Sequence, residues 1–166
     1  HMYRIASHPH MMVKFHTQKE QWELIDSDGS ISYFGDGNLI NHTAQASESQ
    51  VVYNNWIGSA MKTHGTSLIT AWNIASHITP MGRAINYNYF QEKEHVGQTG
   101  LQHTRACYLK QVTDFNGESI HFSYDLKSAD EYVDPHTENG NTSADDYDAY
   151  QERYQRHFLK KMQLKL

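Results

Sequence analysis

Two groups of residues in this sequence could bind a metal ion. Asp26-Ser27-Asp28-Gly29 has the composition of the beginning of a calcium loop, and His8, His10 and His16 could ligate zinc. An EF-hand loop needs further oxygen ligands and a closing Glu at fixed spacing, which do not follow this segment. A zinc site needs three or four convergent ligands. We therefore predict a turn at 26–29, flexible histidines at 8 and 10, and no metal or cofactor site.

Two further groups could take part in catalysis. Glu92-Lys93-Glu94 has the Glu-x-Glu spacing of ADP-ribosyltransferases, but the Ser-containing strand and upstream Arg that complete such a site are not evident. We expect this segment to be a solvated charged loop after a strand. Cys107, the single cysteine, excludes an internal disulfide and has no nominated base, so we expect a small buried strand residue. The sequence therefore predicts no catalytic residue and no enzyme.

The strand histidines and the aromatic residues have two interpretations each. His77 and His121 are expected either to face solvent or to pack. Tyr87 with Tyr89, and Phe122 with Tyr124, could form a strip that binds a sugar or peptide, but cross-strand aromatic packing is the favoured interpretation.

The composition restricts the class of protein. The chain has 166 residues, of which 12% are aromatic and 38% hydrophobic, and its net charge is −5. The aromatic content argues against disorder, and the length suits one domain. Without a Lys/Arg-rich run, nucleic acid is not the expected partner. No stretch approaches a membrane span and no signal peptide is visible.

Apolar residues alternate with polar ones, which is typical of strands. We predict strands and turns at 11–16, 21–25, 26–29 (turn), 30–34, 68–78, 79–82 (turn), 83–89, 106–113, 114–117 (turn) and 119–124. Asn116-Gly117 is the best type I′ turn dipeptide in the chain. The fold class predicted is all-β, with repeated antiparallel hairpins forming a twisted sheet or sandwich-like fragment with long polar loops.

The three hairpins form an internal repeat, interrupted by two segments. Residues 35–66 are a polar insert with apolar patches at Val51-Val52-Tyr53 and Trp56-Ile57, and residues 126–151 form an acidic loop. Residues 154–166 begin a fourth unit without a turn. We therefore expect residues 1–166 to be a single β-rich fragment of a larger protein, with His1-Met2 left from cloning.

The sequence motifs of the hairpins resemble those of a known protein family. Residues 108–124 are similar to the "YL-x-x-[IV]-T-D-x-N-G-x-x-I-x-[FY]-x-Y" pattern of Rhs/YD-repeat proteins. Residues 70–89 and 22–29 resemble two further segments, in the same order, of the amino-terminal region shared by the Salmonella virulence plasmid protein B family and the B components of insecticidal toxin complexes. The segments 131–136 and 150–154 are similar to that region too.

The resemblance implies a function without catalysis. It predicts a structural shell or scaffold segment of a secreted bacterial toxin or virulence protein, which helps to encapsulate or deliver a toxic effector. The expected partners are other segments of the same protein and toxin-complex subunits, in an extracellular location. The alternative from the residues themselves is a binding module that recognises a protein or glycan through its aromatic faces or residues 35–66.

Overall fold

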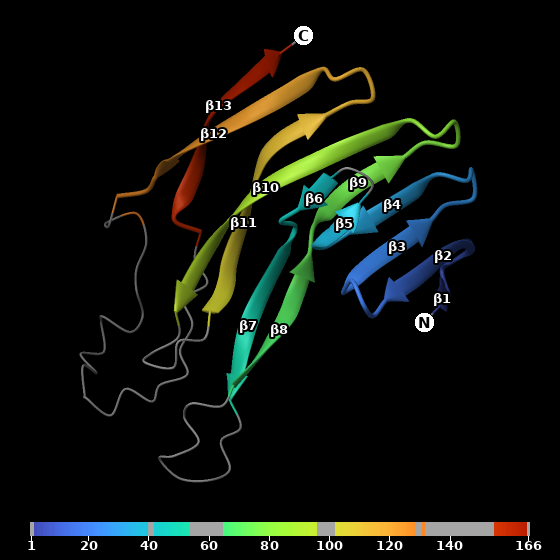
Figure 1. Ribbon diagram of the computed structural model, residues 1–166, viewed down its shortest axis with the longest axis horizontal. Helices are drawn as coiled ribbons and strands as arrows, with labels where there is room; N and C mark the ends of the chain where they lie inside the picture. The colour runs from blue at the N-terminus through green and yellow to red at the C-terminus, as the bar shows by residue number, and fades with distance from the viewer. Residues whose placement is uncertain are drawn as a thin grey trace.

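A computed structural model describes residues 2–39, 42–53, 65–95, 102–128, 131 and 155–165. Over these residues the chain forms strands and turns but no α-helix, which confirms the predicted all-β class (Figure 1). The strands are β1 Met2–Ile5, β2 His8–His16, β3 Gln21–Ile25, β4 Ile31–Phe34, β5 Gly37–Leu39, β6 His42–Ala44, β7 Ser47–Tyr53, β8 Gly65–Trp72, β9 Ile74–Ile78, β10 Ala84–His95, β11 Gln102–Thr113, β12 Ser119–Leu126 and β13 His157–Lys165.

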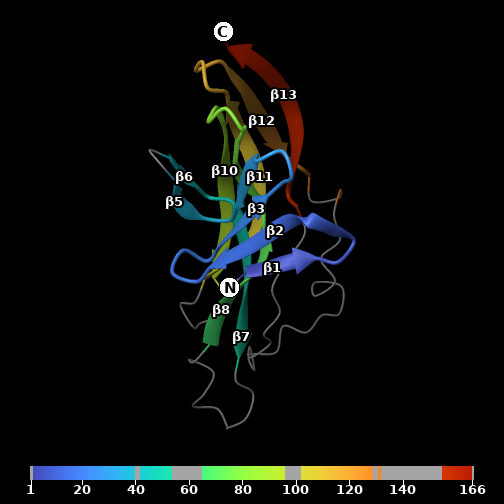
Figure 2. The same ribbon diagram turned by 90° about the vertical axis from the view of Figure 1, so that its right-hand side faces the viewer.

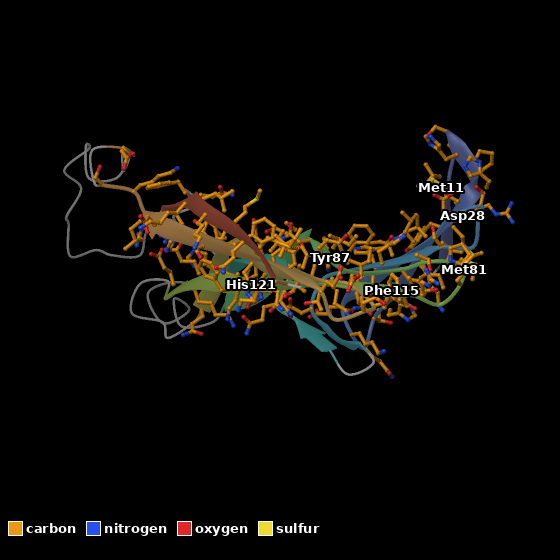
Figure 3. The ribbon with its side chains drawn as sticks, turned by 90° about the horizontal axis from the view of Figure 1, so that it is seen from above. Met11, Asp28, Met81, Tyr87, Phe115 and His121 are labelled. Atoms are coloured by element: carbon orange, nitrogen blue, oxygen red, sulfur yellow. The ribbon has the colours of Figure 1, made fainter. Side chains whose placement is uncertain are left out.

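One long antiparallel sheet organises the molecule. Its strand order is β1-β2-β3-β4-β9-β10-β11-β12-β13, so the chain leaves the sheet after β4 and re-enters beside it as β9. The excursion forms two separate hairpins, β5–β6 and β7–β8. Seen from above, the sheet is a long curved layer with side chains on both sides (Figure 3).

The predicted segment at 35–66 is therefore not only a polar loop. Val51-Val52-Tyr53 ends β7, which pairs with β8, whereas Trp56-Ile57 lies outside the described residues. Of the predicted acidic loop at 126–151, the structure describes only 126–128 and 131, and Leu126 still belongs to β12.

The three predicted hairpins are β3–β4, β9–β10 and β11–β12, and they share one turn geometry. In each, a Gly with positive φ donates its N–H to the carbonyl three residues earlier, at 3.1, 2.8 and 3.2 Å for Gly29, Gly82 and Gly117. Among the described non-glycine residues only Glu20 has a positive φ, so Asn116 does not. The predicted type I′ turn at Asn116-Gly117, which needs positive φ at both residues, is therefore wrong. The geometry is that of a type I turn followed by a left-handed Gly, which accommodates the longer loop.

A tyrosine repeats with the same geometry in two of these hairpins. Tyr89 Oη donates to the carbonyl of Ile74 and Tyr124 Oη to that of Leu109, both at 2.8 Å and both across 15 residues of sequence. Each Tyr follows its turn glycine by the same interval, since 89 − 82 and 124 − 117 both equal seven. The repeat noticed in the sequence thus extends to side-chain hydrogen bonds in these two hairpins.

The strand predicted at 68–78 is interrupted at Asn73. Trp72 ends β8 and Ile74 begins β9, because Asn73 donates its N–H to Ala46 (2.7 Å) and accepts from the N–H of Gly35 (2.9 Å). Gly35 has a φ of 99°, and a Cβ there would lie 2.4 Å from a carbon of the Trp72 ring. Only glycine fits this joint, both for its backbone and for its space.

Few of the described side chains are fully buried, and two of the regions where side chains pack lie at one end and in the middle of the sheet. At one end of the sheet the rings of Phe15 and Trp22 lie 4.6 Å apart, with Trp72 edge-on to Trp22 at 6.1 Å. In the middle, Ala46 and Ala75 are completely buried with Tyr89 packed against them. Aromatic pairs in such geometries add stabilisation beyond the area they bury.

The half of the β10–β11 pair that ends at His95 and Gln102 is covered on both faces. β10 extends beyond the predicted 83–89 to His95, and β11 begins at Gln102 rather than 106. Cys107 contacts β7 through the carbonyl of Ser47, whereas its neighbour Tyr108 contacts His157 at the start of β13. Successive strand residues point to opposite faces, so β7 and β13 pack on opposite faces here. Figure 2 shows the β5–β6 hairpin and β13 on opposite sides of β10 and β11.

We expect Tyr89→Phe and Tyr124→Phe each to lower the free energy of unfolding by about 1 kcal/mol, the usual net value of one hydrogen bond. The double variant should deviate from the sum of the two losses, because Leu109, whose carbonyl accepts the Tyr124 bond, is the cross-strand partner of Tyr89. Urea unfolding followed by circular dichroism measures this. Tyr33→Phe is the matched control, and an equal loss there would show that the hydroxyl bonds are not what stabilises these positions.

Candidate functional site

The best-formed cluster of ionisable side chains lies on the covered part of β10 and β11. Glu92 and Glu94 are strand residues of β10, so the predicted solvated loop at 92–94 is wrong. The Arg105 guanidinium is fully buried and bonds both carboxylates, that of Glu94 at 2.6 Å and that of Glu92 in a close contact. Burying a cation costs free energy unless the cation is paired. The two glutamates are therefore needed to neutralise the buried Arg105 guanidinium.

The cluster continues onto the start of β13. Arg156 bonds Glu94 at 2.9 Å, and His157 Nδ1 lies 3.6 Å from Glu92. The Tyr108 hydroxyl donates to Glu92 at 3.3 Å and accepts the backbone N–H of His157 at the same distance. Burial, reinforced by the Glu92 carboxylate, raises the pKa of Tyr108 above its usual value. These contacts fasten β13 onto the β10–β11 pair.

Aromatic rings surround the same charges. Phe90 stacks on Tyr108 at 4.9 Å, and both rings meet His157, at 5.5 Å and 4.8 Å. Tyr124 lies edge-on to Tyr108 at 5.4 Å. The rings shield the ion pairs in part, since the Arg105 side chain is fully buried while those of Glu92 and Glu94 are 17% and 26% exposed, and this shielding strengthens the pairs. For Tyr89 and Tyr124 the structure agrees with the packing interpretation.

This arrangement suits a fastening of strands better than acid–base catalysis. Both carboxylates of the Glu-x-Glu pair are held by Arg105, and Glu94 by Arg156 as well. A general acid or base must keep an accessible oxygen within reach of a substrate proton. Sequence reasoning considered the glutamates but missed Arg105, because the strand was predicted to begin at 106 whereas β11 begins at Gln102 and includes Arg105.

Cys107 lies in a second polar cluster on the other face of β11, which includes the carboxylates of Asp36 and Glu48. Its thiol donates to the carbonyl of Ser47 at 2.9 Å, and Gln91 donates to the same carbonyl, also at 2.9 Å. Burial, followed by the nearby charges of Glu48 and Asp36, raises the pKa of Cys107 to about 12. The thiol is therefore protonated at neutral pH, and the thiolate needed of a nucleophile is scarce. The residue lies in a strand, as predicted, but it is half-buried rather than buried.

The segment considered for calcium forms the β3–β4 turn. Asp28 accepts the N–H of Ser30 at 2.8 Å, and this bond holds the pKa of its carboxyl below the usual value. Asp114 accepts the N–H groups of Asn116 and Glu118 in the β11–β12 turn, both at 2.9 Å. Carboxylates in these turns thus accept local backbone bonds, as Asp does in turns generally.

The candidate histidines lie on strands and do not converge. His8 and His10 are exposed residues of β2 rather than parts of a loose end, and His16 bonds Glu23 at 2.5 Å. His77 bonds Ser32 and His121 bonds Ser119, both at 3.0 Å. Among the residues that the structure describes, no three His, Cys, Asp or Glu side chains gather as a metal site would require.

Comparison of the chain with protein-family models, with characterised proteins and with solved structures finds no match. The fold and the contacts above are therefore the basis for any functional inference. No helix in the described part of the chain is long and apolar enough to cross a membrane.

Arg105→Met is expected to lower the free energy of unfolding by about 3 kcal/mol, because it leaves two partly buried carboxylates without their partner. The triple variant Glu92→Gln, Glu94→Gln, Arg105→Met should recover about half of that loss, since it buries no unpaired charge. Denaturant unfolding measures both. If Arg105→Met does not fold, recovery of soluble protein by the triple variant is the readout, and a triple variant no better than the single one would contradict the ion-pair account.

Cys107 is expected to resist thiol reagents in the native protein. With a pKa of about 12 instead of 9.0, its thiolate fraction at pH 7.5 is about a thousandfold smaller. Labelling with a chromogenic disulfide should be slow in buffer and fast in denaturant. Rapid labelling of the folded chain would show that the β7 contact does not protect the thiol.

Proposed function

We propose that this chain is a non-catalytic structural segment in the wall of a secreted bacterial toxin or virulence protein. The proposed protein is similar to the Salmonella virulence plasmid protein B family and to the B components of insecticidal toxin complexes, whose sequence motifs the hairpins resemble. In this role the segment contributes to enclosing or delivering a toxic effector, beside other segments of the same protein and toxin-complex subunits.

The observation that carries the proposal is a sheet built from one repeated hairpin. β3–β4, β9–β10 and β11–β12 use the same turn and lie in one sheet. A unit of this kind buries its apolar face only against neighbours, so it suits an extended wall better than a closed globule.

A second observation is the uncovered apolar face near one edge. Ile120 opposes Leu164 and Phe122 opposes Met162 across β12 and β13, so these four side chains share a face. Met162 is 62% exposed and Leu164 is 60% exposed. Neighbouring apolar side chains left in water are typical of a surface that another layer or protein covers.

The ionisable cluster supports a structural role over an enzymatic one. Its two glutamates and two arginines bond one another, and the cluster joins β13 to β10 and β11. A wall needs such fastenings because a single-layer sheet has little core to hold it flat or curved.

A wall segment with an uncovered apolar face is expected to self-associate when isolated. Sedimentation velocity should show larger species as the protein concentration rises. The double variant Met162→Lys with Leu164→Lys should raise the apparent dissociation constant of self-association by at least about tenfold, because apolar burial is lost. Gln163→Lys, on the opposite face of the same strand, is the matched control. A chain that stays monomeric at high concentration, or equal weakening by the control, would count against this function.

A further inference from the structure

Among the residues that the structure describes, β13 is a long sheet edge on which no further strand pairs. Eight of its nine residues pair with β12 on one side, Lys160 being the exception, and β13 ends the strand order on the other. The opposite edge, β1, has only four residues and a shift of register between Arg4 and Ile5. β13 has a shift of register of its own, opposite Ser123 and Tyr124, but its residues 161–165 pair without interruption with 119–123. Short edges are poor templates, whereas a longer edge with an uninterrupted run can accept an added strand.

The two faces of β13 differ in chemistry. Met162 and Leu164 lie on the apolar face. Lys161 opposes Ser123 and Lys165 opposes Ser119, so both lysines lie on the other face. A strand added beside β13 would therefore meet apolar side chains at alternate positions and ammonium groups at positions between them.

The positive charge of this face is not neutralised within the described residues. Lys160 bonds Asp125 at 2.7 Å, but no carboxylate of the described part of the chain pairs with Lys161 or Lys165. Their cross-strand neighbours are serines, and Gln163 between them opposes His121. An incoming strand with carboxylates on this face would supply the missing counter-charge.

The same charge argues against a second copy of the chain as the occupant. Edge-to-edge pairing of two β13 strands would bring the lysines of both copies to one edge, and like charges opposite each other are destabilising. Lysines on edge strands commonly prevent such self-pairing. They do not prevent pairing with a strand of opposite charge, so they select among partners.

We propose that β13 binds, by strand addition, an extended segment of a partner protein in which apolar and acidic residues alternate. The apolar residues continue the Met162 and Leu164 face, and the acidic residues lie beside Lys161 and Lys165. This proposal describes the partner that binds at one edge of the proposed wall. It rests on the proposed wall function only where it assigns this partner to the toxin assembly.

The probe for the test is a capped nine-residue peptide with Glu at odd and Val at even positions. One control replaces every Glu by Lys. A second keeps Glu but replaces the two central valines by Pro, which preserves the charge and removes the donors that strand pairing needs. Fluorescence anisotropy with the full chain should show binding of the first peptide alone, weaker at higher salt.

Charge reversal provides the matched variants. Lys161→Glu with Lys165→Glu should weaken binding of the acidic peptide by at least about tenfold and allow the Lys peptide to bind. Lys19→Glu with Lys110→Glu changes the net charge equally at exposed positions outside β13 and should have little effect. Hydrogen exchange should show new protection of backbone amides within 157–165 when the acidic peptide binds.

Three results would overturn the proposal. Equal binding of the Pro peptide would mean attraction of charge without strand pairing, and equal effects of both double variants would place the binding elsewhere. Protection of 157–165 that rises with the concentration of the chain alone would identify a second copy as the occupant. Self-association through Met162 and Leu164 is measured without peptide, so the proposed wall function can fail or survive independently of this result.

Discussion

The antiparallel pairing of β10 with β11 is the interaction on which the rest of the structure depends. These are the two longest strands, and their register runs from Asn86 opposite Thr113 to His95 opposite Gln102. One half of the pair lies between β9 and β12 in the sheet, and the other half is covered by β7 and by the start of β13. If this ladder separated, the hairpin inserted after β4 and the last strand would both lose their support.

Stability in this protein depends on polar contacts as much as on apolar burial. The completely buried hydrophobic side chains are small, with Ala46 and Ala75 as examples. Arg105, Gln21 and His103 are buried as well. Buried polar groups contribute specificity of pairing when they are satisfied and cost free energy when they are not. Substitutions that break a polar pair should therefore be more harmful here than the loss of one exposed aromatic ring.

Sequence reasoning was most successful where local chemistry determines local structure. Turn glycines and alternating residues identified the three main hairpins, because left-handed φ values and the two-residue period of strands are properties of short segments. The prediction of the turn type was wrong, because the number of loop residues depends on which cross-strand residues form hydrogen bonds. The break at Asn73 was also missed, because it comes from Gly35 and Ala46, both distant in sequence.

The cluster of Glu92, Glu94, Arg105 and Arg156 could not be predicted either, because it also depends on residues that are distant in sequence. Glu92 and Glu94 carry the sequence features of solvated residues, and their burial follows from Arg105 in the facing strand and Arg156 near the end of the chain. Nothing in the local pattern links positions 92, 105 and 156. Long-range pairs of this kind depend on strand order, which the sequence pattern alone left open, and the functional proposals accordingly depend on the assembled sheet.

The joint between Gly35 and Asn73 gives the fold a modular character. The backbone bond from Gly35 to Asn73 at 2.9 Å closes the excursion between β4 and β9, and the register of the main sheet resumes directly after it. Since the entropy of closing a loop grows only slowly with its length, an insertion at this joint can lengthen, shorten or change its hairpins at small cost. The main sheet can therefore keep its repeat while the outer parts of the excursion diversify, provided that Ala46 and Ser47 keep their contacts with β10 and β11.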